Sequence, residues 1–254
     1  MNKASLGDRM KQYESVSKNY LMRRQPVIIR LDGKSFHTFT RGFEKPFDDV
    51  LIGAMQQTML DLCMEIQGCV IGYTQSDEIT LVLCDYQKLD TDAWFKYNVQ
   101  KMVSVTASMA TLYFNNEFVR HLLKCHAGNT NKSKPINAYV RSSQKGALFD
   151  ARVFNVPIEE VNNCLLWRQQ DATRNSLQMI AQYLFSRKEI LGIDNNKLQD
   201  KMFTEKGVNW NDLPVHKKRG CCCIKDSEGN WIIDNDIPIF SQDPSYINSR
   251  IVFE

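Results

Sequence analysis

The sequence has no long hydrophobic run. Its amino-terminal segment is polar, and apolar residues never continue without interruption for the roughly 18 positions that a membrane-spanning helix needs. A secretory signal peptide would also require an apolar stretch near the start of the chain. We therefore expect a cytoplasmic protein that has no membrane partner.

The cysteines do not form the usual metal-binding or redox motifs. Eight are present, but no C-x-x-C pair occurs, and three are adjacent at Cys221 to Cys223. Neighbouring residues of a strand point to opposite faces, so this triplet cannot enclose one tetrahedral metal ion. Reduced, mostly buried thiols in a cytosolic protein fit this pattern best.

Several motifs of common enzyme classes are absent as well. No G-x-G-x-x-G and no G-x-S-x-G occurs. Gly33-Lys34-Ser35 resembles the end of a P-loop, but the first glycine of that motif would fall at Ile28. Asp234 to Asp236 begins like an EF-hand loop, but Pro238 occupies a ligand position and the required glycine is missing.

Positive charge is in slight excess. The net charge of +3 and the pI near 8.3 are too mild to indicate a nucleic-acid partner by themselves. Basic residues gather in two places, a polar stretch from Lys124 to Lys145 that we predict as a loop, and the run Lys217 to Arg219. Such runs are usually solvated, although both are also plausible contacts to a phosphate backbone.

The order of apolar patterns predicts an α+β fold. Over residues 26–156 they follow the order strand, helix, strand, strand, helix, strand, which is the ferredoxin-like split βαβ arrangement. The strands are predicted at 26–31, 69–74, 79–83 and 148–156, and the helices at 49–67 and 91–119. This sheet would bury one face against the two helices and leave the other face free for a ligand.

The carboxy-terminal part is predicted to be helical with one β-hairpin. Pro157 is placed to open a helix that runs to Gln169, and a second helix follows to Leu191. A hairpin is expected from strands at 220–225 and 230–234. We assign residues 1–156 to a domain built on the split βαβ sheet and residues 157–254 to an extension that packs on it as one structural unit.

Two carboxylates stand where predicted strands meet turns. They are Asp32, before Gly33, and Asp77, in the turn between the central strands. In a split βαβ sheet these positions lie at one edge, where a hard divalent cation would offset the repulsion between the carboxylates. Glu78 would face the other way in a regular strand, so it receives a supporting role. The alternative is a solvated Asp-Gly turn.

The residues after Asp32 suit a phosphate. Gly33 allows the backbone to approach an anion closely. The backbone amides that follow would form a cradle, and the lysine adds charge. The amides belong to Lys34, Ser35, Phe36 and His37.

Five segments in this order closely resemble the tRNA(His) guanylyltransferase family, and in particular its bacterial branch of template-directed 3′-to-5′ polymerases. They are RLDGKSFHTF, YTQSDEITLVL, WFKYNVQKMVSVTAS, DARVFNVP and LLWRQQDATRNS. The resemblance spans roughly residues 8–225. It implies a palm domain with two Mg²⁺ ions held by Asp32, Asp77 and the carbonyl of Gly33. It also implies a triphosphate lying along residues 32–37 and against Ser76.

The resemblance implies further site residues, with two departures. Lys96 and Lys101 match positions that bind a second triphosphate, but Tyr97 and Asn98 replace a basic pair of some eukaryotic members. The eukaryotic signature His-Ile-Asn-Asn-Leu-Tyr-Asn is replaced by TRNSLQM at residues 173–179, which keeps Asn175 and Leu177 and loses the histidine. Asn175 is therefore a candidate contact to nucleotide or RNA.

The implied activity is addition of nucleotides to the 5′ end of tRNA in the 3′-to-5′ direction. Family members activate a 5′-monophosphate with ATP or GTP, and the 3′-hydroxyl of the incoming nucleotide then attacks it. Loss of the signature histidine favours template-dependent repair of 5′-truncated tRNA over dedicated tRNA(His) guanylylation. The resemblance also suggests a homotetramer. The alternatives are a nucleotide cyclase on the same scaffold and a non-catalytic RNA-binding ferredoxin-like module.

Overall fold

The computed structural model describes residues 4–127 and 136–253. Its sheet has the strand order β4-β1-β3-β2-β5-β6, and every neighbouring pair is antiparallel. The strands are β1 (Val27–Gly33), β2 (Cys69–Gln75), β3 (Glu78–Leu83), β4 (Phe149–Asn155), β5 (Cys221–Lys225) and β6 (Trp231–Asp234). Because β3 lies between β1 and β2, the first four strands form the predicted split βαβ unit. The α+β palm-like fold class is confirmed.

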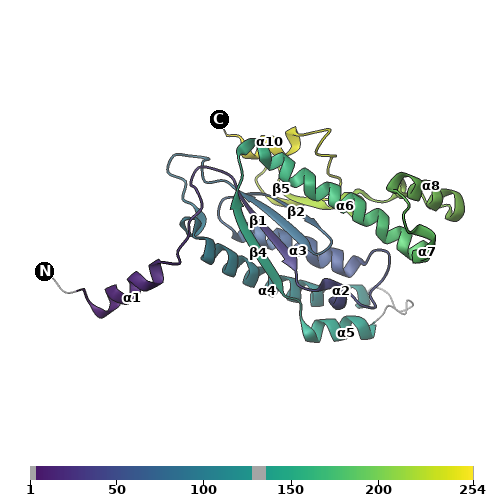
Figure 1. Cartoon of the computed structure of the whole chain (residues 1–254), viewed down its shortest axis with the longest axis horizontal. Coiled ribbons are helices and arrows are strands. Elements are labelled where there is room, and N and C mark those ends of the chain that lie inside the picture. The colour runs from purple at the N-terminus through teal and green to yellow at the C-terminus, as the bar shows by residue number, and fades with distance from the viewer. Residues whose placement is uncertain (1–3, 128–135, 254) are drawn as a thin grey trace.

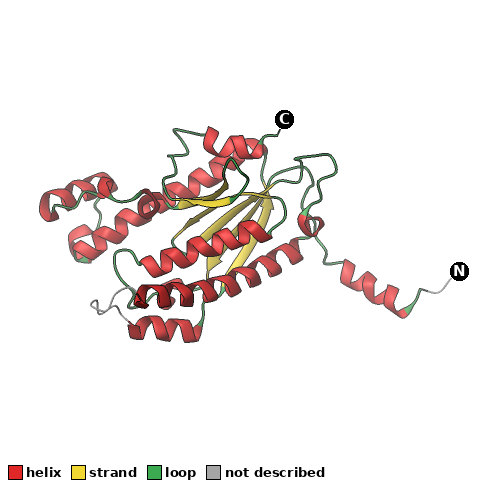
Figure 2. Cartoon of the chain, turned by 180° about the vertical axis from the view of Figure 1, so that it is seen from behind, coloured by secondary structure: helices red, strands yellow, loops and turns green. Residues whose placement is uncertain are grey.

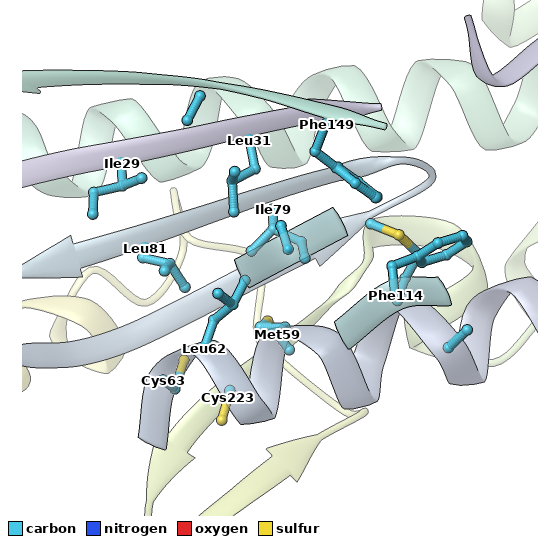
Figure 3. Close-up of a cluster of buried hydrophobic side chains, with 14 of the residues drawn as sticks. Ile29, Leu31, Met59, Leu62, Cys63, Ile79, Leu81, Phe114, Phe149 and Cys223 are labelled. Carbon is cyan, nitrogen blue, oxygen red and sulfur yellow. The ribbon is translucent and has the colours of Figure 1, made fainter. Parts of the chain in front are cut away.

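Two long helices cover one face of this sheet (Figure 2). They are α3 (Asp49–Glu65) and α4 (Val99–Ala127). The Asp48 side chain caps α3 by accepting a hydrogen bond from the Leu51 amide at 2.9 Å. Alternate residues of β1 and β3 point toward these helices, and Figure 3 shows them packed against α3. Ile29, Leu31, Ile79 and Leu81 are at most 1% exposed, so this layer is a closed core.

The opposite face is also covered over part of its area. Helix α6 (Val161–Leu184) crosses it, with α10 (Ser245–Ile251) beside it (Figure 1). Ile28 and Val82 of the sheet are buried in one cluster with Leu165 of α6. The expectation that this face is left free is therefore wrong here, because the carboxy-terminal extension supplies a second hydrophobic core.

The carboxy-terminal elements differ from the prediction in one respect. The two helices expected before Leu191 are one continuous helix, α6, followed by the short α7 (Arg187–Ile190). No proline or glycine interrupts residues 158–184, so nothing in the sequence breaks the helix. The predicted hairpin is present as β5 and β6, and it extends the same sheet. The division into domains at residue 156 stays a prediction.

The segment predicted as a basic loop is largely helical. Helix α4 extends to Ala127, and α5 (Ile136–Lys145) follows. Lys132 and Lys134 lie outside the described residues. Helix α5 docks because Tyr139 is fully buried and its hydroxyl donates a 2.6 Å hydrogen bond to Asp48. Only Ala138, Tyr139 and Ser142 of α5 are buried, which is too few to give a clear apolar period in the sequence.

The remaining helices are short or peripheral. Helix α1 (Leu6–Ser15) extends away from the body of the molecule (Figure 1). Among the described residues, no helix combines the length and apolar character needed to cross a membrane. The other elements are α2 (Phe36–Phe39), α8 (Asn195–Lys206), α9 (Val215–Arg219) and the 3₁₀ segments η1 (Trp94–Tyr97), η2 (Ile158–Glu160) and η3 (Trp210–Asp212).

Candidate active site

The end of β1 and the β2–β3 turn bring the predicted carboxylates to one end of the sheet. Asp32 lies directly opposite Glu78 in the β1–β3 register, and the Gly33 amide donates a 3.1 Å hydrogen bond to the Asp77 carbonyl. Ser76, which precedes Asp77 in the turn, has a left-handed backbone with φ of 51°. A non-glycine residue in this region is strained, and such residues gather at functional sites.

These residues open onto a cavity of about 540 Å³. That volume lies within the range of small-molecule sites. The walls come from the end of β1, α2, the loop that follows it, the β2–β3 turn and the end of α6. The lining residues are Asp32, Gly33, Ser35, Phe36, His37, Thr40, Phe43, Glu44, Lys45, Pro46, Asp48, Leu51, Ser76, Asp77, Met179, Gln182 and Tyr183.

Asp77 is the carboxylate whose electrostatics are most perturbed. Burial raises its pKa from an ordinary 3.8 to about 6, and the negative charges of Asp32 and Glu78 add to this effect. A 3.1 Å hydrogen bond from the Ser76 hydroxyl acts in the opposite direction and lowers the pKa. Asp77 near neutral pH is thus a carboxylate that gains from a nearby cation.

Glu78 is held by arginines. Burial raises its pKa, while Arg168 and Arg30 lower it. Arg168 Nε lies 3.0 Å from Glu78 Oε2, and Arg30 Nη2 lies 3.7 Å from the same oxygen. Arg168 also pairs with Asp171 at 2.7 Å and stacks on the Trp167 ring. Glu78 therefore joins the sheet to α6, while the supporting role predicted for it in catalysis stays a prediction.

Sequence reasoning missed these two arginines. A signal for Arg30 was present, because it stands two residues before Asp32 and so points to the same face of β1. Its neighbours Ile29 and Leu31 are apolar, which marks a charged side chain at the edge of a core. Arg168 has no comparable signal, since its position opposite Glu78 depends on how α6 crosses the sheet.

Three of the four amides predicted to bind phosphate are free of a backbone acceptor in the described structure, and the fourth is not. Lys34 is exposed, does not line the cavity, and uses its amide to donate to the Leu148 carbonyl at 2.8 Å. The amides of Ser35, Phe36 and His37 stand at the start of α2, where helix N–H groups have no acceptor within the helix. The phosphate cradle stays a prediction, and three amides instead of four are placed for it.

Gly33 is required where it stands. A Cβ atom at this position would lie 2.3 Å from the Phe36 ring, which is buried in an aromatic cluster. The glycine thus lets the β1 backbone reach the cavity wall while Phe36 remains packed beneath it.

The other predicted site residues lie in two different places. Asn175 lines a smaller adjoining cavity of about 90 Å³ together with Ser76 and Met179, which line both cavities. Lys96 and Lys101 line neither. Lys101 stands ten residues before Thr111, which contacts the Phe149 amide near Gly33, so it lies about 15 Å away along α4. One chain does not bring these lysines to the carboxylates.

The donor set suits a magnesium ion that is shared with a substrate. In the part of the chain that the structure describes, no three His, Cys, Asp or Glu side chains form a metal cage. Mg²⁺ is commonly held by one or two carboxylates together with substrate phosphates. Asp32, Asp77 and the backbone carbonyl of Gly33 offer oxygen atoms that could serve in this way.

An antiparallel palm-like sheet with two carboxylates at the mouth of a nucleotide-sized cavity defines a class, the palm-type nucleotidyltransferases. Comparison with known proteins gives the particular family. A sequence model of tRNAHis guanylyltransferase matches residues 7–157. The chain therefore belongs to the tRNA(His) guanylyltransferase family, which is a family of nucleotidyltransferases.

Solved structures and relatives agree with this assignment. A bacterial tRNA(His) guanylyltransferase-like protein in complex with ATP is 43% identical, covers 98% of this chain and 100% of its own, and has a TM-score of 0.85. A bacterial protein of the same description in complex with GTP is 37% identical with the same coverage and a TM-score of 0.76. A probable tRNA(His) guanylyltransferase of Dictyostelium discoideum is 26% identical over 78% of this chain and 75% of its own.

Proposed function

We propose that this protein is a Mg²⁺-dependent nucleotidyltransferase that adds nucleotides to the 5′ end of tRNA in the 3′-to-5′ direction. The observation that carries the proposal is the convergence of Asp32 and Asp77 at the mouth of the cavity formed by β1, α2 and the β2–β3 turn. Similarity to nucleotide-bound structures over nearly the whole chain supports ATP and GTP as substrates.

Asp32, Asp77 and the Gly33 carbonyl are the residues that would hold two Mg²⁺ ions. Bound there, Mg²⁺ would neutralise triphosphate charge and favour deprotonation of an attacking hydroxyl. The raised pKa of Asp77 supports this assignment, because a carboxylate in that environment is stabilised by a cation.

The protein's own groups then position the nucleotide. The amides of Ser35, Phe36 and His37 donate hydrogen bonds to phosphate oxygens, and Ser76 lies against the triphosphate on the other side of the cavity. In the first step an oxygen of the RNA 5′-monophosphate bonds to the α-phosphorus of ATP or GTP, and pyrophosphate leaves. In the second step the 3′-hydroxyl of the incoming nucleotide bonds to the activated 5′-phosphorus, and the nucleoside monophosphate leaves.

Template-dependent repair of 5′-truncated tRNA is the reaction that we favour over dedicated tRNA(His) guanylylation. Thr173 stands where the eukaryotic signature has histidine, while Asn175 is kept beside the cavity. We further propose that the protein acts in the cytoplasm as a homotetramer. The cyclase and the RNA-binding module remain the alternatives to be tested.

The test is an extension assay on 5′-monophosphorylated tRNA that lacks its first nucleotide, with Mg²⁺, ATP and GTP. We expect addition of the base that pairs with the opposite strand, and no product with Asp32→Ala or Asp77→Ala variants that keep the wild-type circular dichroism spectrum. Undiminished product in either variant would overturn the site assignment. Cyclic nucleotide formed without RNA would favour a cyclase, and RNA binding without any product would favour the binding module.

A further inference from the structure

A second concavity, of about 190 Å³, is lined by three cations and lies next to the candidate active site. Arg41 follows α2, and Arg141 and Lys145 belong to α5. The hydroxyl-bearing Thr38 and Ser142 complete the polar lining, and no carboxylate is part of it. We call these three cations the α2–α5 basic cluster.

The cluster is held together by contacts between elements that lie far apart in the sequence. Arg141 Nη2 donates a hydrogen bond to the Arg41 carbonyl, and the Ser142 hydroxyl donates to the Phe39 carbonyl at 2.6 Å. These bonds fix α5 against α2 and orient one guanidinium in advance. Preorganised donors lose less conformational entropy when they bind a ligand.

The three cations form no salt bridge within the part of the chain that the structure describes. None of the ion pairs there includes Arg41, Arg141 or Lys145. Neighbouring like charges repel one another, and an anion between them removes that repulsion. Arginine is particularly suited to phosphate, because its planar group donates two parallel hydrogen bonds.

The other basic run of the chain behaves differently. Lys217 pairs with Asp49 at 2.7 Å, and Lys218 is buried with its ammonium donating to the Asn211 carbonyl at 2.6 Å. Arg219 lies over the Trp210 ring. These side chains are used within the fold, so the 217–219 run is not a free basic surface. The α2–α5 basic cluster remains available for a ligand.

The position of the cluster relates it to the reaction. Thr40, just after α2, lines the active-site cavity, whereas Thr38 and Phe39 line the basic concavity. The two sites thus flank one short helix, whose diameter with side chains is about 10 Å. The basic concavity therefore lies beside the cavity that would hold the reacting end of a nucleic acid.

We propose that the α2–α5 basic cluster binds backbone phosphates of the RNA close to the reacting 5′ end. This inference rests on the proposed function, because it takes the RNA end to be at Asp32 and Asp77. The same phosphate chemistry also occurs in the triphosphate of a second nucleotide. The two sources can be distinguished by experiment. If the cluster binds RNA, the affinity for RNA depends on it, and if the cluster binds a triphosphate, the KM for the nucleotide depends on it.

The test compares two double variants of the full chain. Arg41→Gln/Lys145→Gln removes two exposed cations of the cluster and leaves the Arg141 hydrogen bond in place. Lys88→Gln/Lys225→Gln removes the same charge from two exposed residues, of which Lys88 follows β3 and Lys225 is the last residue of β5. Binding of 5′-monophosphorylated tRNA lacking its first nucleotide is measured in EDTA without nucleotide, at several salt concentrations. The KM for ATP is measured separately in the extension assay.

For the cluster variant we expect the Kd for RNA to rise about tenfold and the slope of log Kd against log salt to fall by about 2, one for each lost phosphate contact. The KM for ATP and the behaviour of the control variant should stay near wild type. A raised KM for ATP with unchanged RNA binding would assign the cluster to a triphosphate and overturn the proposal. Unchanged values for both substrates would show that the cations are only solvated, which overturns it as well.

Failure of the proposed function would be seen elsewhere in the same experiment. If wild-type protein bound the RNA but did not extend it, the enzymatic assignment would fall, and the binding comparison would still decide whether the cluster holds phosphate. If wild-type extension were normal and the cluster variant bound RNA normally, only the inference about the cluster would fall.

Discussion

Among individual residues, Asp77 carries an electrostatic cost that the fold does not require. Burial and the charges of Asp32 and Glu78 raise its pKa to about 6, so keeping it ionised at neutral pH costs free energy in the folded state. A neutral residue of similar shape would remove this cost. Carboxylates retained under such conditions are typical of functional sites, where stability is given up for activity.

This cost predicts how Asp77→Asn changes stability. A carboxyl group with a raised folded-state pKa destabilises the fold fully above about pH 6, and the effect fades as pH falls toward its ordinary value of 3.8. In EDTA at pH 7.5 the variant should therefore melt at a higher temperature than wild type, and the difference should shrink by pH 4.5. Mg²⁺ should raise the Tm of wild type only. Thermal unfolding measures both effects, and a lower Tm for the variant at pH 7.5 would contradict the argument.

Arg168 is expected to be essential for stability. It is 4% exposed and lies between Glu78 and Asp171, so Arg168→Ala leaves buried negative charge without compensation. Removing one partner of a buried ion pair costs about 3 kcal/mol, and this loss should appear in urea unfolding. Arg174→Ala is the control, because Arg174 pairs with the same Asp171 from an exposed position, where about 0 to 1 kcal/mol is expected. Equal losses in the two variants would show that burial is not the cause.

At the level of elements, the sequence predicted those helices and strands whose apolar residues recur with a regular period. The helix that became α3 has a clear apolar repeat and the cap at Asp48, and the strands of the palm alternate or run apolar between turn residues. Helix α5 was missed because its docking depends on Tyr139 reaching Asp48 across 91 residues. Contacts of this range have no local signal.

The candidate site likewise has a part that could be predicted from the sequence and a part that could not. Asp32 and Asp77 could be placed together because strand order in a split βαβ unit fixes which turns meet. The contacts of Arg168 and Lys217 could not be predicted, because each depends on the position of a carboxy-terminal helix relative to the palm. The contact of Lys34 could not be predicted either, because its amide donates a hydrogen bond to the carbonyl of Leu148, which precedes β4.

The junction of β1 and α2 predicts a strong effect of Gly33→Ala. The new methyl group would lie 2.3 Å from the Phe36 ring, which packs against Phe114 and Phe149 with centroids 5.4 and 5.3 Å away. Overpacking of this kind costs about 1 to 3 kcal/mol and should displace α2, so nucleotide binding should weaken as well. Urea unfolding and ATP titration measure the two effects.

Two further variants make this prediction specific. Gly33→Ala/Phe36→Leu should regain part of the stability, because the smaller side chain leaves room for the methyl group. Gly7→Ala is the matched control, since in α1 the nearest atom to its Cβ is 3.8 Å away and alanine is the better helix former. No loss of stability in Gly33→Ala would show that α2 adjusts freely at this junction.

At the level of the whole molecule, the two proposed nucleotide-binding regions are far apart. Lys96 and Lys101 lie near the start of α4, whereas Asp32 and Asp77 lie at the opposite end of the sheet. A part for these lysines in the same reaction therefore requires a second copy of the chain. Every residue from position 4 to position 20 is exposed, and α1 presents Leu6, Met10 and Tyr13 to solvent, as an arm that contacts another subunit would.

This separation predicts complementation between inactive variants. Asp77→Asn keeps both lysines, and Lys96→Gln/Lys101→Gln keeps the cavity, so a hybrid oligomer would contain one intact pair of regions contributed by two chains. Mixed subunits should recover on the order of a quarter of wild-type extension activity, while mixtures of Asp32→Ala with Asp77→Asn should recover none, because both lesions fall in one cavity. Full activity of the lysine variant alone would remove these residues from the mechanism. A lysine variant that is inactive and cannot be rescued would contradict the argument. Both regions would then have to act within one chain, and α4 would have to rearrange to bring them together.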